Sequence, residues 1–214
     1  MSDSPAVVHV VDDDDSFRTA VGRQLKTAGY RVKEYTGAAE FLMDPPDEQE
    51  ASCVLLDLNL PGPSGLDLQE AMVRRGGTLP VIFLTGEGDV RQSVRAMRQG
   101  AVDFLTKPVA RAELLAAVRE ALGRQAHHAD AAARRREIAR RFDRLTARER
   151  EVFEDVVTGR LSKQIASRLG ISERTIKAHR SRIMRKMEVS SLAELGRVAA
   201  ELPDRPPSAP GSAE

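Results

Sequence analysis

The sequence predicts a doubly wound α/β domain with a five-stranded parallel sheet, followed by a small all-α domain that a helical linker joins to it. In the first 120 residues, short apolar runs alternate with amphipathic stretches whose apolar residues recur three and four positions apart. This pattern is typical of strands that alternate with helices. Beyond residue 120 only the helical pattern continues. A chain of 214 residues with 41% apolar content can form two domains with separate cores.

Five short apolar runs predict the strands of the first domain. They are residues 7–11, 31–35, 52–56, 81–84 and 102–106. Between them, segments such as SFRTAVGRQLKTAG space their apolar residues as a helix does and stop at glycine. Strands that alternate with helices are joined by right-handed crossovers, so the sheet is parallel and covered on both faces. Binding sites in such sheets form at the carboxyl ends of the strands.

The rest of the chain divides by composition. We expect the first domain at 1–122, a helical linker at 123–141, the all-α domain at 142–202 and a disordered tail at 203–214. The linker is rich in Ala and Arg and has too few apolar residues to specify a tight coiled coil, so a dimeric linker stays open. Nothing in the pattern at 123–137 indicates attachment to either domain. The tail is rich in Pro and Ser, which is typical of disorder.

Charge is unevenly distributed behind a net charge of +1. Residues 1–120 carry 13 basic and 19 acidic side chains, whereas residues 141–197 carry 14 basic and 8 acidic ones. Acidic clusters can bind divalent cations, and a small basic domain suggests nucleic acid, although chance variation in surface charge also fits these counts.

The sequence also restricts the compartment. The single cysteine, Cys53, lies in an apolar run, so it indicates a core residue and excludes disulfides within the chain and Cys-based zinc sites. No run approaches the roughly 18 apolar residues of a membrane span. The start MSDSP lacks the features of a signal peptide. We expect a cytoplasmic protein with no membrane association.

Polar residues follow four of the five predicted strands. Asp12 and Asp13 follow the first strand, Asp57 the third, Thr85 the fourth and Lys107 the fifth. All of them are expected at one edge of the sheet. Carboxylates with a backbone carbonyl form an oxygen-lined site suited to Mg²⁺. Beside a cation, a carboxylate can act as a nucleophile toward phosphorus, while a lysine and a hydroxyl stabilise the phosphoryl oxygens.

The motifs VVDDD, LLDLNLPGPSGLDL, VIFLTGEGD and AVDFLTKP occur in this order. Together they resemble the receiver domain of two-component response regulators, over nearly the whole first domain. The resemblance implies a flavodoxin-like fold in which Asp57 accepts a phosphoryl group from a sensor histidine kinase. It implies that Asp13 binds Mg²⁺ directly and Asp12 largely through water. Asp57 and the backbone carbonyl of Asn59 complete the implied metal site.

The same resemblance assigns residues that respond to phosphorylation. Thr85 and Lys107 hold the phosphoryl group, and Thr85 moves toward it. Phe104 then rotates into the vacated space, so Thr85 and Phe104 form the implied switch. This signal passes to a face formed by residues 90–99 and 102–122. From the residues alone, the alternative that Phe104 is an ordinary core residue stays open.

Capping residues and glycines mark the helices of the basic domain. Thr146 and Glu149 form a T-x-x-E capping box. The other expected helix ends are Gly159, Ser162, Gly170 and Ser172, with Ser162 and Ser172 as N-caps. A short helix, a tight turn with glycine and a longer helix at 173–187 predict a helix-turn-helix.

The longer helix has one apolar and one polar face. Ile176, Ile183 and Met187 fall on one side and are expected to be buried. The opposite face carries Lys177, Ala178, Ser181, Arg182 and Arg185. A cationic face at this place fits insertion into the DNA major groove, with Arg182 or Arg185 reaching phosphates. A solvated basic helix is the alternative.

This segment closely resembles the LuxR-type DNA-binding domain, with its LTxRE opening, G-x-x-x-K-x-IA turn and IS-x-x-T-[IV]-K-x-H recognition helix. The resemblance implies base contacts by Lys177, Ala178 and Ser181. It implies phosphate contacts by Lys163, Thr175 and Arg182. A receiver followed by a LuxR-type domain defines the NarL/FixJ class of regulators, and the sequence resembles the FixJ branch most.

We therefore expect a phosphorylation-dependent transcriptional regulator, not an enzyme, that binds promoter DNA as a homodimer. One alternative is a DNA-binding or interaction protein that works without phosphorylation. An aspartyl phosphatase is a second, but Asn59 stands where such enzymes typically have an aspartate. The weakly attached linker favours control by dimerisation over masking of the DNA-binding domain. The kinase, stimulus, operator, target genes, and whether the protein activates or represses transcription stay open.

Overall fold

The computed structural model describes residues 5–47, 50–76, 79–86 and 90–202, with the backbone alone for 90–93. The chain divides into two units, Met1–Ala129 and Asp130–Glu214. The first unit is α/β and the second is all-α, as the sequence predicts. The tail expected to be disordered, at 203–214, lies outside the described residues.

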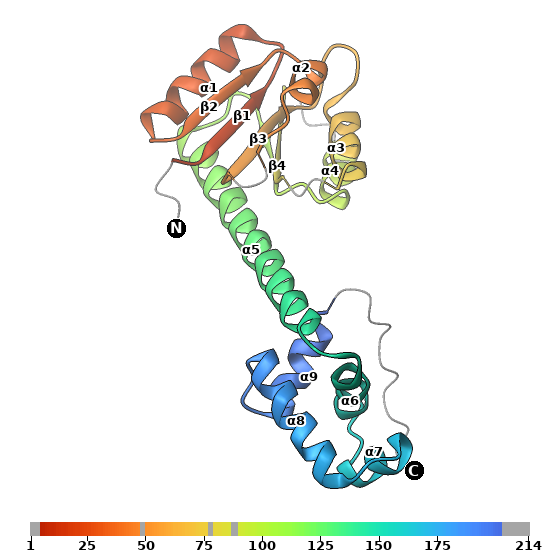
Figure 1. Cartoon of the computed structure of the whole chain (residues 1–214). Helices are drawn as coiled ribbons and strands as arrows, with labels where there is room; N and C mark the ends of the chain where they lie inside the picture. Colours follow the sequence, from red (N-terminus) through yellow and green to blue (C-terminus); the bar gives the residue numbers. More distant parts are fainter. Residues whose placement is uncertain (1–4, 48–49, 77–78, 87–89, 203–214) are drawn as a thin grey trace. The chain divides into compact units, whose positions relative to one another are not determined.

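The first unit contains a five-stranded parallel sheet in the order β2-β1-β3-β4-β5. Its strands are β1 (Val7–Val11), β2 (Arg31–Tyr35), β3 (Ser52–Asp57), β4 (Val81–Thr85) and β5 (Asp103–Thr106). The helices between them are α1 (Asp15–Thr27), α2 (Ala38–Met43), α3 (Gly65–Arg74) and α4 (Val90–Arg98), and α5 (Arg111–Asp143) follows β5 (Figure 1). All five predicted strands are confirmed, with ends that differ by one residue at most.

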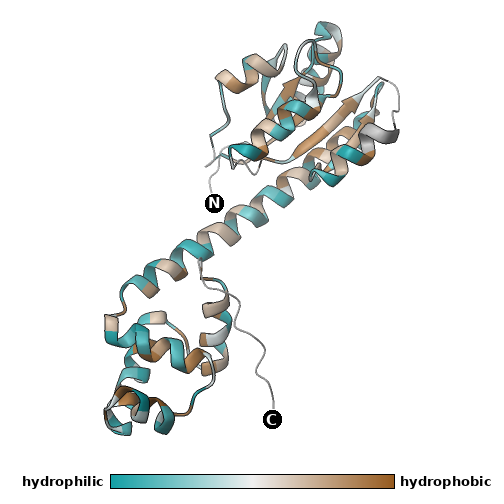
Figure 2. Ribbon diagram, turned by 90° about the vertical axis from the view of Figure 1, so that its right-hand side faces the viewer, coloured by the Kyte–Doolittle hydropathy of each residue, from teal (hydrophilic) through white to brown (hydrophobic). Residues whose placement is uncertain are grey.

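Two apolar cores lie on the two faces of this sheet. Because side chains alternate along a strand, neighbours in β3 belong to different cores. Leu56 packs with residues of α2 and α3, whereas Leu55 packs with residues of α1 and α5. Cys53 is buried in the second of these cores, as expected. Figure 2 shows hydrophobic colour on strands inside the sheet, and hydrophilic and hydrophobic residues in alternation along the helices around it. Burial on both faces leaves the carboxyl edge of the sheet as the place for polar side chains.

Helix α5 is one continuous helix of 33 residues, so the predicted linker is its second half. The expectation that little holds residues 123–137 is wrong. The side-chain oxygen of Gln125 accepts a hydrogen bond from the Ser52 amide (2.6 Å), and its Nε2 donates to the Glu50 carbonyl (3.1 Å). Farther along, Arg134 pairs with Glu201 at 2.8 Å. The periodicity missed these attachments because they are polar and their partners are distant in sequence.

The second unit contains α6 (Ala147–Val157), α7 (Ser162–Leu169), α8 (Glu173–Met187) and α9 (Leu192–Ala200) around one core, into which Ile138 of α5 also packs. The Thr146–Glu149 capping box and the Ser172 cap are confirmed. The predicted Ser162 cap is wrong, because α7 begins at Ser162 and Leu161 is its N-cap. The Gln164 side chain accepts a hydrogen bond from the Leu161 amide instead (2.9 Å). Within the described ranges, no helix is long and apolar enough to cross a membrane.

Candidate phosphorylation site and DNA-binding surface

Three carboxylates meet at the carboxyl edge of the sheet. Asp57 is the last residue of β3, and Asp12 and Asp13 directly follow β1. Because β1 and β3 are neighbours in the sheet, their ends lie side by side. Asp12 and Asp57 are buried and Asp13 is exposed, and one oxygen of each lies within 4.8 Å of the others. The structure therefore brings together the three acidic residues that the sequence predicted.

Lys107 extends its ammonium group into this cluster. Its Nζ lies 2.6 Å from Asp12 Oδ2 and 3.2 Å from Asp57 Oδ2. The Lys107 amide donates to the Thr85 carbonyl, and the Nζ lies 4.3 Å from the centre of the Phe17 ring. These contacts fix a cation beside the Asp57 carboxylate, where phosphoryl oxygens would need one.

The electrostatics of the cluster favour a further cation. Burial raises the pKa of the Asp12 carboxyl, against the opposing effects of Lys107 and of a hydrogen bond from the Asp14 amide (3.0 Å). A carboxylate in this position is stabilised by positive charge. Mg²⁺ prefers oxygen ligands and keeps several waters. Two buried carboxylates and one exposed to solvent fit such an ion.

The loop after Asp57 depends on a close backbone approach. The Asn59 amide lies 3.5 Å from Asp57 Oδ1. The Gly65 amide donates to the Leu58 carbonyl (3.0 Å), which folds the start of α3 back onto the end of β3. A Cβ at Gly65 would overlap the Asp57 carbonyl oxygen. Sequence reasoning missed Gly65, although the quoted motif PSGLDL contains it. The metal-binding role of the Asn59 carbonyl stays a prediction.

Thr85 and Phe104 lie on the two neighbouring strands at the other side of the cluster. Thr85 ends β4 and is fully buried. Phe104 pairs with Phe83 across β4 and β5, and its partly buried ring packs against the core that contains Leu56. Both positions suit the predicted switch, and their roles stay predictions.

In the second unit, α7 and α8 form the predicted helix-turn-helix. Gly170, with φ +64°, closes α7, and Ser172 Oγ accepts a hydrogen bond from the Thr175 amide (3.1 Å) to begin α8. The apolar side of α8 is buried as expected. The predicted DNA contacts are all exposed: Lys163, Thr175, Lys177, Ala178, Ser181, Arg182 and Arg185. The surface they form is accessible to a large partner.

Ion pairs with a buried carboxylate hold these helices in place, and sequence reasoning missed them. Asp155 of α6 is buried and pairs with Arg160 and Arg168, at 2.6 and 2.5 Å. Glu149, predicted only as part of a capping box, also pairs with Lys186 at 2.6 Å. Because the partners lie 5 to 37 residues apart, no local pattern reveals all of these contacts.

Comparison with known families identifies both domains. Residues 8–119 match the model of the response regulator receiver domain, and residues 143–199 match that of bacterial regulatory proteins of the luxR family. The chain belongs to the response regulators with a LuxR-type DNA-binding domain. It is therefore a transcriptional regulator of a family whose members are not typical enzymes.

The alignments with known relatives extend over nearly the whole of this chain. The response regulator protein TodT of Pseudomonas putida is 40% identical over 204 residues, which cover 95% of this chain and 89% of TodT. The transcriptional regulatory protein FixJ of Azorhizobium caulinodans is 43% identical over 192 residues, 90% of each chain. A solved structure of the response regulator StyR is 37% identical, with a TM-score of 0.79 and coverage of 92% and 99%. The expected likeness to FixJ is confirmed.

Proposed function

We propose that this response regulator accepts a phosphoryl group on Asp57 from a sensor histidine kinase, and binds promoter DNA as a homodimer in response. One observation carries the first half. The Lys107 ammonium lies between Asp12 and Asp57, beside a cluster of three carboxylates that fits Mg²⁺. A nucleophile, a cation for the phosphoryl oxygens and ligands for a metal ion are thus within reach of one another.

The proposed reaction is a phosphoryl transfer between two side chains. An oxygen of Asp57 attacks phosphorus, the bond between phosphorus and the kinase histidine breaks, and the imidazole leaves. Asp13, Asp57 and the Asn59 carbonyl, with Asp12 largely through water, would hold Mg²⁺, which would supply positive charge to offset the phosphoryl oxygens. The Lys107 ammonium leaves its ion pair with Asp57 and forms one with a phosphoryl oxygen. Positioning of these groups supplies most of the rate enhancement in such transfers.

The response begins at Thr85. Its hydroxyl moves to donate to the phosphoryl group, and Phe104 moves inward. Phe104 packs against the core that contains Ala96 of α4, and Val94 and Met97 of this helix are exposed apolar side chains. Apolar groups on a face that changes on phosphorylation suit a dimer contact. Dimerisation then pairs two DNA-binding units.

DNA recognition uses the exposed face of α8. Lys177, Ala178 and Ser181 face base edges in the major groove. Lys163, Thr175, Arg182 and Arg185 contact phosphates. A dimer presents two such helices to half-sites spaced by about one turn of DNA. Phosphate contacts make the affinity fall steeply with salt concentration.

The decisive experiment compares Asp57→Asn with Asp15→Asn, which alters a carboxylate that follows Asp12 and Asp13 in sequence but lies outside the cluster. With acetyl phosphate and Mg²⁺, we expect wild type and Asp15→Asn to take up phosphate and Asp57→Asn to take up none. Phosphate uptake by Asp57→Asn contradicts the assignment. Asp57→Asn could also take up no phosphate and still bind DNA and dimerise like the phosphorylated wild type. That result favours regulation without phosphorylation. Multiple turnovers on phosphomonoesters would favour a phosphatase.

A further inference from the structure

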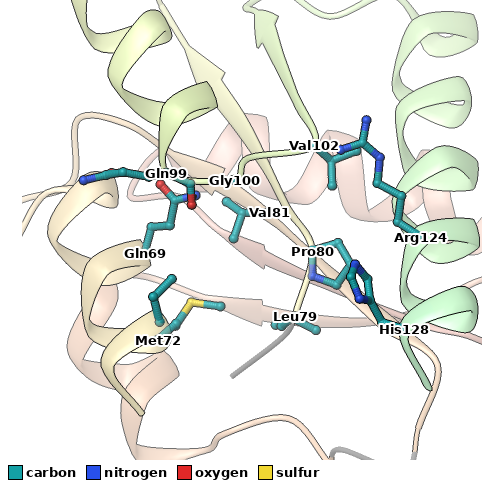
Figure 3. A pocket seen from close by; sticks show the side chains of 11 residues that line it. Gln69, Met72, Leu79, Pro80, Val81, Gln99, Gly100, Val102, Arg124 and His128 are labelled. Carbon is teal, nitrogen blue, oxygen red and sulfur yellow. The ribbon is translucent and has the colours of Figure 1, made fainter. Parts of the chain in front are cut away.

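A hollow lies in the receiver at the end of the sheet opposite to the predicted phosphorylation site. Its walls come from α3, the start of β4, the connection between α4 and β5, and α5. Figure 3 shows Gln69 of α3 on one side, Arg124 and His128 of α5 on the other, and Pro80 and Val81 between them. We call this hollow the α3–α5 pocket.

The size and walls of the α3–α5 pocket suit a small apolar body. Its volume of about 160 Å³ is close to the roughly 150 Å³ of an engineered cavity that binds benzene. About half of the lining is apolar, from the side chains of Met72, Val73, Leu79, Pro80, Val81 and Val102. Ligand sites commonly combine such walls with a few polar groups that fix orientation. A ring of about six atoms fits this description.

One wall carries hydrogen-bond acceptors that lack donors. Gln69 is only 2% exposed, and its Nε2 donates to the Gln99 carbonyl (3.4 Å), which sets the orientation of the amide. Gln99 donates through its own Nε2 to Glu70 (2.7 Å). Among the described residues, the Oε1 atoms of Gln69 and Gln99 have no hydrogen-bond partner. A buried acceptor without a donor is unfavourable, so the complementary ligand group is a hydroxyl or an N–H.

The opposite wall carries a guanidinium and an imidazole, which can donate hydrogen bonds to an anion. Arg124 and His128 lie one helical turn apart on α5, beyond residue 119, where the match to the receiver family ends. Arg124 pairs with Glu120 at 2.7 Å, and both side chains are about half exposed. Such a surface pair contributes little stability, so the guanidinium can leave it. A guanidinium binds a carboxylate through two parallel hydrogen bonds.

We propose that the α3–α5 pocket binds a small organic acid. Arg124 and His128 hold its carboxylate, the apolar walls surround a ring-sized body, and a hydroxyl or amino group at the far end donates to Gln69 Oε1. A ligand in this place holds α5 against the receiver near the point where the helix leaves it. Binding needs neither phosphate nor DNA, so its test is independent of the proposed function.

The test uses the unphosphorylated full-length chain and three matched probes. 4-Hydroxybenzoate has both polar ends, benzoate lacks the hydroxyl, and 4-hydroxybenzamide lacks the charge. Saturation-transfer NMR at millimolar probe concentrations measures the three dissociation constants. We expect 4-hydroxybenzoate to bind about tenfold more tightly than the benzamide and a few-fold more tightly than benzoate. Absence of binding by 4-hydroxybenzoate, or equal affinity for all three probes, overturns the proposal.

Three variants locate the binding. Arg124→Gln removes the cation, and Gln69→Met removes the acceptor at nearly constant volume. Arg119→Gln makes the same charge change at an exposed position of α5 outside the pocket. We expect about tenfold weaker 4-hydroxybenzoate binding for Arg124→Gln, a smaller loss for Gln69→Met and none for Arg119→Gln. Equal losses for Arg124→Gln and Arg119→Gln indicate nonspecific attraction and overturn the proposal. Unchanged binding by both pocket variants does the same.

Discussion

Mild acid should destabilise the receiver through His9, a buried residue of β1. His9 Nδ1 lies 3.0 Å from the Tyr35 hydroxyl, which lies 3.1 Å from Asp44 Oδ2. An ionised Asp44 only accepts hydrogen bonds, so Tyr35 donates its single proton to Asp44 and accepts one from His9. Neutral His9 therefore carries its proton on Nδ1. Protonation must add a second proton at Nε2, on a ring that is 2% exposed and packs against Phe41.

The size of the effect follows from the pKa of His9. Burial, with a smaller contribution from the Lys33 charge, lowers this pKa from 6.5 to about 4. Between these values the unfolded chain binds the proton and the folded chain does not, so the free energy of unfolding falls as pH falls. A full difference of 2.5 units corresponds to about 3 kcal/mol, reached near pH 4. At pH 5 the expected loss is about 2 kcal/mol relative to pH 8.

Tyrosine fluorescence can measure this loss in the full-length chain. The protein has no tryptophan, and its two tyrosines, Tyr30 and Tyr35, both lie in the first unit. Urea unfolding followed by their emission therefore reports on the receiver. Other groups also titrate in this range, so the quantity compared is the change between pH 8 and pH 5 in wild type and variants.

Two variants isolate the contribution of His9. His9→Gln keeps a donor for Tyr35 but cannot titrate, so its loss of stability between pH 8 and pH 5 should be smaller than that of wild type by about 2 kcal/mol. His127→Gln changes an exposed histidine and should behave like wild type. If His9→Gln loses as much stability as wild type over this range, the reasoning is refuted.

Three other substitutions, one of them with a matched control, test the loop after β3, the attachment of α5 and the predicted DNA-binding surface. Gly65→Ala forces the loop away from Asp57, so it should lower the stability of the receiver by about 2 kcal/mol and slow phosphorylation by acetyl phosphate. The control is Gly123→Ala on α5, where the added methyl group meets no other atom. It should stabilise the protein by about 0.5–1 kcal/mol. Gln125→Leu leaves the Ser52 amide at the start of β3 without its acceptor, while the Glu50 carbonyl still accepts from Ser52 Oγ. The substitution should cost about 1–3 kcal/mol, with faster amide exchange at the start of that strand. Lys177→Ala should weaken binding to the preferred DNA site more than to random DNA.

Each of these predictions has a contrary outcome. Equal rates of phosphorylation for the two glycine variants would show that the loop tolerates a side chain. Unchanged amide exchange in Gln125→Leu would show that the hydrogen bonds of Gln125 do not protect the start of β3. An equal loss of affinity for both DNAs, together with a salt dependence weaker by about one phosphate contact, would place Lys177 on phosphate.

Much of the fold could be predicted because its determinants are local. Apolar runs gave the strands within one residue of their observed ends. Helix starts at Thr146 and Ser172 follow from side chains that accept hydrogen bonds from amides three residues later. The Ser162 cap is wrong because α7 begins one residue earlier than predicted, with Leu161 as its N-cap. Gln164 accepts a hydrogen bond from the Leu161 amide, and Ser162 Oγ accepts one from Arg180 (2.8 Å).

The sequence by itself determined which residues meet at the proposed phosphorylation site, because the ends of parallel strands must share an edge. Their order along the chain was enough to place Asp12, Asp57 and Lys107 together. Only the tertiary structure decided how the Lys107 ammonium lies relative to the two carboxylates, and which groups Gln125 of α5 binds. The same holds for the partners of Asp155. These contacts join side chains that are distant in sequence, and neither periodicity nor capping carries information about such pairs.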